Sequence, residues 1–189
     1  MPIALFALLS CSEGELFVLP IEESAEATVP AADPLTGSLV ELVGDLGFAQ
    51  FAEMEISESE ELKNQGVAPG DITTVTLVSF DLEVASPEGG DLSFLSSVDV
   101  YVNAAEEEQL LIASLDNFPE GEPAVTFELE AVELAPYVLS DSMSISTDVV
   151  GTLPDEETVV VARFALDVGV TKQGACNAIS NKEQDTGVE

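Results

Sequence analysis

Apolar and polar residues alternate along much of the chain between residues 72 and 170. In the clearest segment, Phe80, Leu82 and Val84 alternate with two acidic residues. Successive side chains of a strand point to opposite faces of a sheet, so this pattern predicts strands with one buried face. The predicted strands cover residues 72–84, 98–103, 109–114, 124–131, 142–149 and 158–170.

The segments between these strands carry turn signals. Residues 57–66 predict one or two helical turns that end at Gly66, and residues 69–71 predict a turn. Apolar residues before Val78 fall on the opposite parity, which indicates either a bulge there or burial of both faces. Loop 91–95 is expected to fill one end of the core with its Leu and Phe, and turn 134–138 to bury its tyrosine.

Short alternating strands with almost no helix predict an all-β fold, an antiparallel β-sandwich of about seven strands with one or two short helical turns. The order of elements resembles an immunoglobulin-like or LEA-type sandwich of the kind found in exported bacterial lipoproteins. This resemblance is one of architecture, and no diagnostic cysteine or tryptophan accompanies it. Architecture of this kind does not specify a function.

The N-terminal residues carry a more specific pattern. A short apolar run closes with Leu8-Leu9-Ser10-Cys11 and is followed at once by polar residues. This segment resembles a bacterial lipobox, which implies cleavage before Cys11, lipidation of that cysteine and export. A signal peptide normally begins with Lys or Arg, and none precedes Cys11. A start codon further upstream would explain this absence. The alternative is a buried N-terminal strand that ends in Ser-Cys.

The domain organisation follows from these two patterns. Residues 1–10 are predicted as a signal peptide, 11–47 as a lipid-anchored tether that includes an edge strand near 39–43, 48–170 as the sandwich and 171–189 as a flexible tail. Within the sandwich, Met54 and Ile56 alternate with polar residues and favour a first strand. No apolar run approaches the roughly 20 residues that a membrane-spanning helix needs.

The charge of the chain is extremely asymmetric. It has 37 acidic residues and only four basic ones, Lys63, Arg163, Lys172 and Lys182, for a net charge of −33. Such a chain repels nucleic-acid backbones, so we expect no nucleic-acid partner. Such acidity is typical of proteins that are highly soluble or adapted to a salty medium. Cation binding is the more specific alternative.

The composition argues against common catalytic sites. The 189 residues include no histidine, so Ser-His and Cys-His arrangements cannot form. Zinc would have to use carboxylates and one thiol. Cys176 is expected to be an incidental free thiol if Cys11 is acylated. Paired carboxylates could hydrolyse glycosides, but with so many acids no pair stands out.

Calcium is the most specific ligand that the sequence favours, because carboxylates on loops supply its oxygens. Clusters without EF-hand spacing are candidates; these are Glu106, Glu107, Glu108, Asp155, Glu156 and Glu157, and also Asp116 with Glu120 and Glu122. We expect no other cofactor. The sequence predicts a non-enzymatic, exported lipoprotein, on the outer membrane, the cell surface or the periplasmic side. It would act as a structural or interaction module with an unknown protein partner; the alternatives are a calcium-binding or small-ligand-binding sandwich and a carboxylate-only hydrolase.

Overall fold

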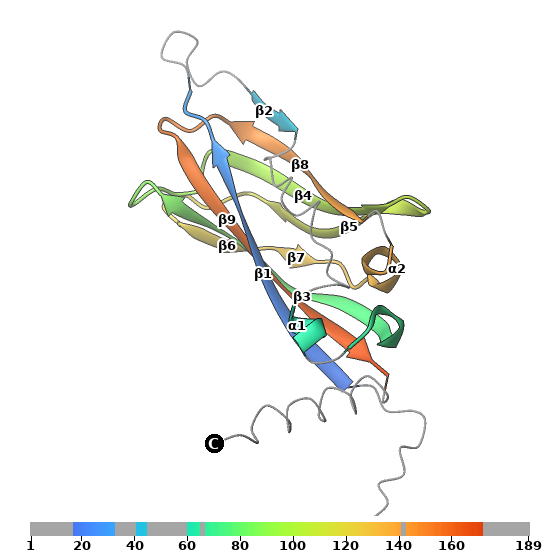
Figure 1. Cartoon of the computed structure of the whole chain (residues 1–189). Coiled ribbons are helices and arrows are strands. Elements are labelled where there is room, and N and C mark those ends of the chain that lie inside the picture. The colour runs from blue at the N-terminus through green and yellow to red at the C-terminus, as the bar shows by residue number, and fades with distance from the viewer. Residues whose placement is uncertain (1–16, 33–40, 45–59, 65–66, 141–142, 172–189) are drawn as a thin grey trace, which may run out of the picture.

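The computed structural model describes residues 17–32, 41–44, 60–64, 67–140 and 143–171 (Figure 1). The described strands are β1 (Phe17–Val29), β2 (Glu41–Gly44), β3 (Ile72–Ser86), β4 (Leu95–Ala104), β5 (Glu107–Asp116), β6 (Ala124–Thr126), β7 (Glu128–Leu129), β8 (Ser144–Thr152) and β9 (Thr158–Val170). The helical turns are α1 (Glu60–Asn64), the 3-10 turn η4 (Pro69–Asp71) and α2 (Ala135–Val138).

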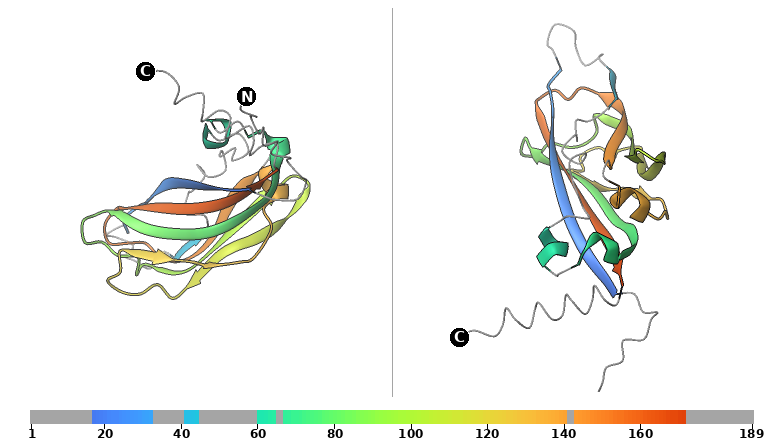
Figure 2. Two further views of the ribbon diagram at one scale, coloured as in Figure 1. Left: turned by 90° about the horizontal axis from the view of Figure 1, so that it is seen from below. Right: turned by 45° about the vertical axis from the view of Figure 1, so that its right-hand side comes forward.

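The strands form two antiparallel sheets packed face to face, and the predicted all-β sandwich is therefore confirmed. Sheet A has the order β1-β9-β3-β6, and sheet B has the order β2-β8-β4-β5-β7. Figure 2 shows the two layers from below and from the side. Between them lies one apolar core, in which Val75, Val100 and Val160 are completely buried.

The strand pairs are nested around one hairpin. Strand β4 pairs with β5, β3 with β6, β2 with β8 and β1 with β9, all antiparallel. Successive pairs alternate between the sheets: β4–β5 and β2–β8 lie in sheet B, and β3–β6 and β1–β9 lie in sheet A. This is the strand order of a jelly roll. The sandwich was predicted correctly, but the immunoglobulin-like order was wrong.

The predicted strand at 124–131 belongs to both sheets. It pairs first with β3 as β6 and then with β5 as β7. The change occurs at Phe127, which is buried and meets the rings of Phe80 and Phe118 edge to face, at centroid distances of 4.9 and 6.2 Å. This aromatic cluster closes one side of the sandwich. The sequence indicated one strand in one sheet for residues 124–131, and the structure divides it between two sheets.

Strand β1 occupies residues that were predicted to belong to the tether. Its 13 residues pair with β9 over their full length, from Phe17 opposite Val170 to Val29 opposite Thr158. Ile21, Ala25 and Val29 enter the core. The sandwich therefore begins at Phe17 rather than at residue 48. The predicted edge strand near residues 39–43 corresponds to β2, which pairs with the end of β8.

Other local predictions are confirmed. Strand β9 has the predicted bounds, and the register of β3 against β9 shifts between Leu77 and Ser79, where the bulge was expected. Leu92 and Phe94 are buried in the core. Tyr137 is buried in α2 and donates a hydrogen bond to the carbonyl oxygen of Glu108 at 2.7 Å.

Several predictions fall on residues outside the described ranges. These are the lipobox-like segment with Cys11, the alternation at 53–57, the capping residues of the predicted helix at 57–66, the C-terminal tail and Cys176. Within the described residues, α1 coincides with the predicted helix. None of the described helices has the length and apolar character needed to span a bilayer.

Candidate functional site

Three loops meet at one end of the sandwich, which we call the loop end. They are the β3–β4 loop (87–94), the β5–β6 loop (117–123) and the β8–β9 loop (153–157). Backbone hydrogen bonds join them to each other and to the sheets: Leu92 N–H donates to the Glu122 carbonyl at 3.4 Å, and Thr152 N–H to the Phe94 carbonyl at 2.7 Å. The loop end is therefore tied directly to the core strands.

Asp91 is the central polar residue of the loop end. Its carboxylate accepts hydrogen bonds from the Ser93 N–H at 3.0 Å, the Ser93 hydroxyl at 2.6 Å and the Gly121 N–H at 2.9 Å. Gly121 has a φ of +75°, a conformation that favours glycine, and this brings its N–H toward Asp91. One carboxylate thus joins the β3–β4 and β5–β6 loops.

These hydrogen bonds lower the pKa of Asp91 from its ordinary value. The Ser93 hydroxyl has the largest effect, followed by the backbone N–H groups of Ser93 and Gly121, and slight burial opposes them. All three donors favour the ionised carboxylate. Asp91 is therefore a structural group whose charge holds the loops together.

We expect Asp91→Asn to lower the urea midpoint of unfolding at pH 7. Because the folded pKa lies below the unfolded one, the contribution of the charge is fully present above the unfolded pKa of about 3.9 and is lost as the pH falls through the folded pKa. The difference between Asp91→Asn and wild type should therefore shrink as the pH is lowered below about 4. A difference that stays constant from pH 7 to pH 3 would contradict this role.

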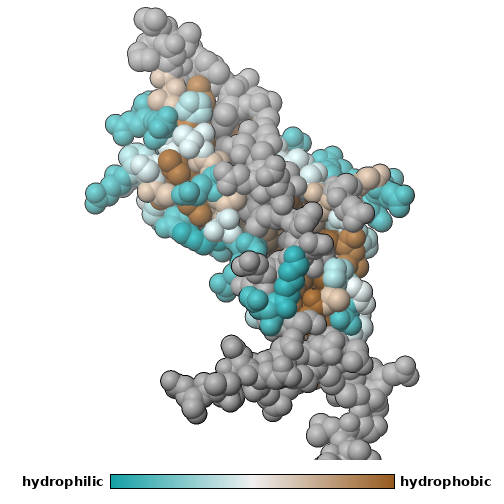
Figure 3. Space-filling view, in the orientation of Figure 1, coloured by the Kyte–Doolittle hydropathy of each residue, from teal (hydrophilic) through white to brown (hydrophobic). Residues whose placement is uncertain are grey.

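A hollow of about 590 Å³ opens between the β3–β4 and β8–β9 loops. Its lining includes four carboxylates, those of Glu88, Asp91, Asp155 and Glu156, together with apolar and backbone groups. Figure 3 shows hydrophilic residues over the loops that protrude on the left of the molecule. No Lys or Arg lies among the lining residues, so a positively charged group fits this hollow better than an anion.

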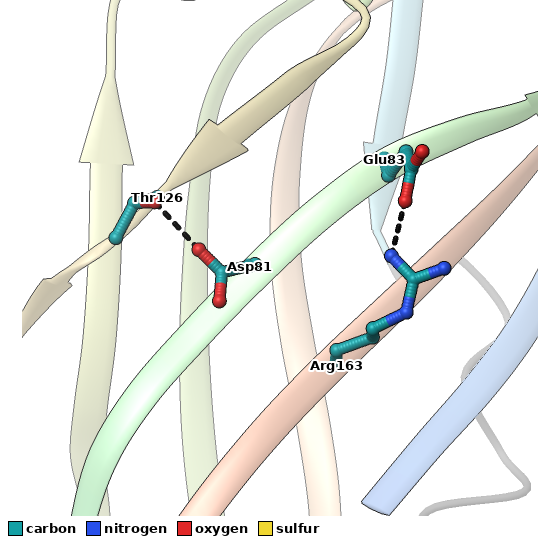
Figure 4. A network of polar contacts seen from close by, with 4 residues as sticks. All are labelled: Asp81, Glu83, Thr126 and Arg163. Atoms are coloured by element: carbon teal, nitrogen blue, oxygen red, sulfur yellow. Dashed lines mark hydrogen bonds and ion pairs between the residues drawn. The ribbon is translucent and has the colours of Figure 1, made fainter.

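A second hollow, of about 460 Å³, lies on the outer face of sheet A. It is lined by residues of β1, β3 and β9, including Arg163, the only arginine of the chain. Arg163 forms an ion pair with Glu83, and Thr126 donates a hydrogen bond to Asp81 at 2.5 Å (Figure 4). Both Arg163 and Glu83 are solvent-exposed, so their pair contributes little to stability.

The outer face of sheet B carries a pair of like charges that the sequence analysis did not single out. Asp99 of β4 lies directly opposite Asp148 of β8. Partial burial raises the pKa of the neighbouring Tyr101, and the charges of Asp99 and Asp148 raise it further. The sequence does not mark either aspartate, because each occupies an ordinary outward position of an alternating strand.

The predicted calcium clusters lie apart from one another. Glu106 lies in the β4–β5 turn, Glu107 and Glu108 begin β5, and Asp155, Glu156 and Glu157 lie in the β8–β9 loop. Because β4 and β8 are antiparallel neighbours, these two clusters occupy opposite ends of sheet B. Asp116 ends β5, and Glu120 and Glu122 follow in the β5–β6 loop. Among the described residues, no three acidic or cysteine side chains converge as metal ligands would.

Comparisons with known proteins show only distant similarity. No protein-family model matches the chain, and the search of curated proteins finds no match. The chain is similar in structure to the BFDV capsid protein in its decameric form, with 10% identity and a TM-score of 0.40 over 82% of this chain and 99% of that chain. The 60-mer form of the same protein gives 9% identity and a TM-score of 0.39 over 85% and 95%.

Proposed function

We propose that this chain is a non-enzymatic exported lipoprotein, anchored at the cell envelope through Cys11, whose sandwich is an interaction module. The observation that carries the anchor is the position of β1. The first described strand begins at Phe17, six residues after Cys11, so cleavage before Cys11 would leave every described element intact. The polar residues 12–15 would then connect the lipid to the sandwich.

The filled interior supports an interaction role rather than an internal ligand site. Between the sheets, among the described residues, a cavity of only about 20 Å³ lies beside Phe80, Ile112 and Phe164. Typical pockets for small molecules measure about 300–1,000 Å³. The hollows of that size lie outside the core, at the loop end and on sheet A. A partner would therefore meet the surface of the sandwich.

The charge of the chain favours a positively charged partner. The loop end presents Glu88 on the β3–β4 loop, which the Asp91 hydrogen bonds hold in place, and Asp155 and Glu156 on the β8–β9 loop. Carboxylates on a held loop attract a basic surface with little loss of loop entropy on binding. We therefore expect association with such a partner to weaken as the salt concentration rises.

Membrane attachment tests the proposal with a matched pair of cysteine variants. The chain has two cysteines, Cys11 and Cys176. Expressed from the native gene with its upstream region, wild type and Cys176→Ser should partition into the detergent-rich phase, because both keep the acylated residue. Cys11→Ser should move to the aqueous phase or stay uncleaved. Equal partitioning of the two variants, with the same acylated mature mass, would contradict anchoring through Cys11.

A further inference from the structure

The described fold begins very close to the proposed anchor. An extended chain spans at most about 3.3–3.6 Å per residue, so Phe17 lies within about 20 Å of Cys11. Strand β1 has 13 residues and is about 40 Å long at a rise of roughly 3.3 Å per residue. The connection is therefore shorter than the sandwich itself, and the end at which β1 begins must lie near the lipid.

That end is well defined in the structure, and we call it the proximal pole. Phe17 lies opposite Val170, the last residue of β9, and Val170 lies opposite Ile72, the first residue of β3. Thr171 closes the pole on η4, because its N–H donates to the Asp71 carbonyl at 2.7 Å and its hydroxyl to the Asp71 carboxylate at 3.0 Å. Figures 1 and 2 show this pole at the start of β1, at the opposite end of that strand from the β8–β9 loop.

The proximal pole exposes apolar side chains where the anchor would enter. Phe17 is 46% exposed and Val18 is 55% exposed, and they are the first two residues of β1, so one lies on each face of the strand at its end. Phenylalanine and aliphatic side chains are the groups that a protein buries at the boundary of lipid headgroups and acyl chains. A single exposed apolar residue would be unremarkable, but these two stand at the point of attachment.

The acidic residues of the loop end favour the same orientation. The hollow at the loop end is lined by four carboxylates, and anionic headgroups repel them. Helix α1 lies beside the part of β1 that leads to the proximal pole in Figures 1 and 2, and its Lys63 is outnumbered by Glu60 and Glu61. Asp71 lies at this pole too, but its carboxylate already accepts hydrogen bonds from Thr171 and from Ala68 N–H.

We propose that the proximal pole rests on the lipid surface, with Phe17 and Val18 in the headgroup region, so that the loop end faces away from the membrane. This inference rests on the proposed anchor at Cys11. It gives that anchor a second contact with the lipid surface. It also presents the acidic hollow to partners in solution.

The absence of tryptophan from the chain permits a clean test. Phe17→Trp places a fluorophore at the proximal pole. Val150→Trp is the matched control, because Val150 is 47% exposed and lies in β8 beside Gly151, two residues before the end of that strand. Each variant would be purified in acylated form, and its mass would be measured. It would then be reconstituted into phosphatidylcholine vesicles with or without brominated acyl chains.

We expect bromine to quench Phe17→Trp by about twofold or more, because an interfacial side chain lies about 5–10 Å into the headgroup and acyl boundary. Val150→Trp should be unaffected. Equal quenching of both variants, or quenching of neither in an acylated sample, would overturn the docking and leave the anchor standing. A blue shift of Phe17→Trp without quenching by bromine would indicate a protein contact instead and would also overturn it. Absence of acyl mass would overturn the anchor and the docking together.

Discussion

Ile21→Ala is expected to destabilise the sandwich by about 2–5 kcal/mol, the usual cost of removing a buried isoleucine side chain beyond its β-carbon. Ile21 is only 1% exposed and lies on the inner face of β1, opposite Leu166 of β9. The expected loss is a large part of the stability of a domain of this size. Urea unfolding of the unacylated chain, followed by circular dichroism, would measure it.

The neighbouring residue supplies the control for this prediction. Glu22 follows Ile21 in β1 but points outward and is exposed. Glu22→Ala should change the free energy of unfolding by no more than about 0.5 kcal/mol. If both variants unfolded at the wild-type urea concentration, residues 17–29 would behave as a tether, and their place in sheet A would be wrong.

Gly151→Ala is expected to cost about 1–3 kcal/mol, because a β-carbon at this position has no room. It would meet the Phe94 carbonyl oxygen closer than real β-carbons approach, and would lie 3.1 Å from the α-carbon of Leu95. Both neighbours are backbone atoms, and the Phe94 carbonyl also accepts the Thr152 N–H. The strands β4 and β8 would have to separate where they support the loop end.

Gly70→Ala is the matched control for the close approach at Gly151. A β-carbon at Gly70 would meet no atom within 4 Å, and Gly70 does not have a positive φ. Its replacement should leave stability unchanged or raise it by about 0.4–1 kcal/mol through the lower entropy of the unfolded chain. The same urea experiment would compare the two variants. Equal effects at Gly151 and Gly70 would contradict the described packing of β8 against the β3–β4 loop.

The strands that the sequence predicted best are those with large apolar residues at alternate positions. In β9, Val160, Phe164 and Leu166 give a strong pattern, and the structure confirms its bounds. In β1 the inward positions include Glu23, Ala25 and Ala27, so the apolar signal is weak. A proline at position 20 weakens it further, although proline is tolerated in a strand at the edge of a sheet.

The order of the strands could not be predicted from local patterns. Alternation shows that a segment has two faces, but it does not say which sheet covers the inner one. The passage of residues 124–129 from sheet A to sheet B depends on the packing of Phe127 between Phe80 and Phe118, which are 47 and 9 residues away in the sequence. The nested jelly-roll order has the same long-range origin.

The candidate site was only partly visible in the sequence for a related reason. Asp155 and Glu156 were recognised as a loop cluster, and they do line the hollow at the loop end. Their neighbours Glu88 and Asp91 come from a loop more than sixty residues earlier, which the sequence indicated only as a turn. The hydrogen bond from Gly121 to Asp91 joins residues 30 positions apart and leaves no local signal.

The intact mass of the protein recovered from host membranes tests the central claim most directly. The gene would be expressed with its upstream region, and the protein would be extracted in detergent. We predict a mature N-terminus at Cys11 and added acyl mass on that residue. An unmodified chain that keeps the residues before Cys11 would contradict the anchor, and with it the export and the membrane orientation proposed for this sandwich.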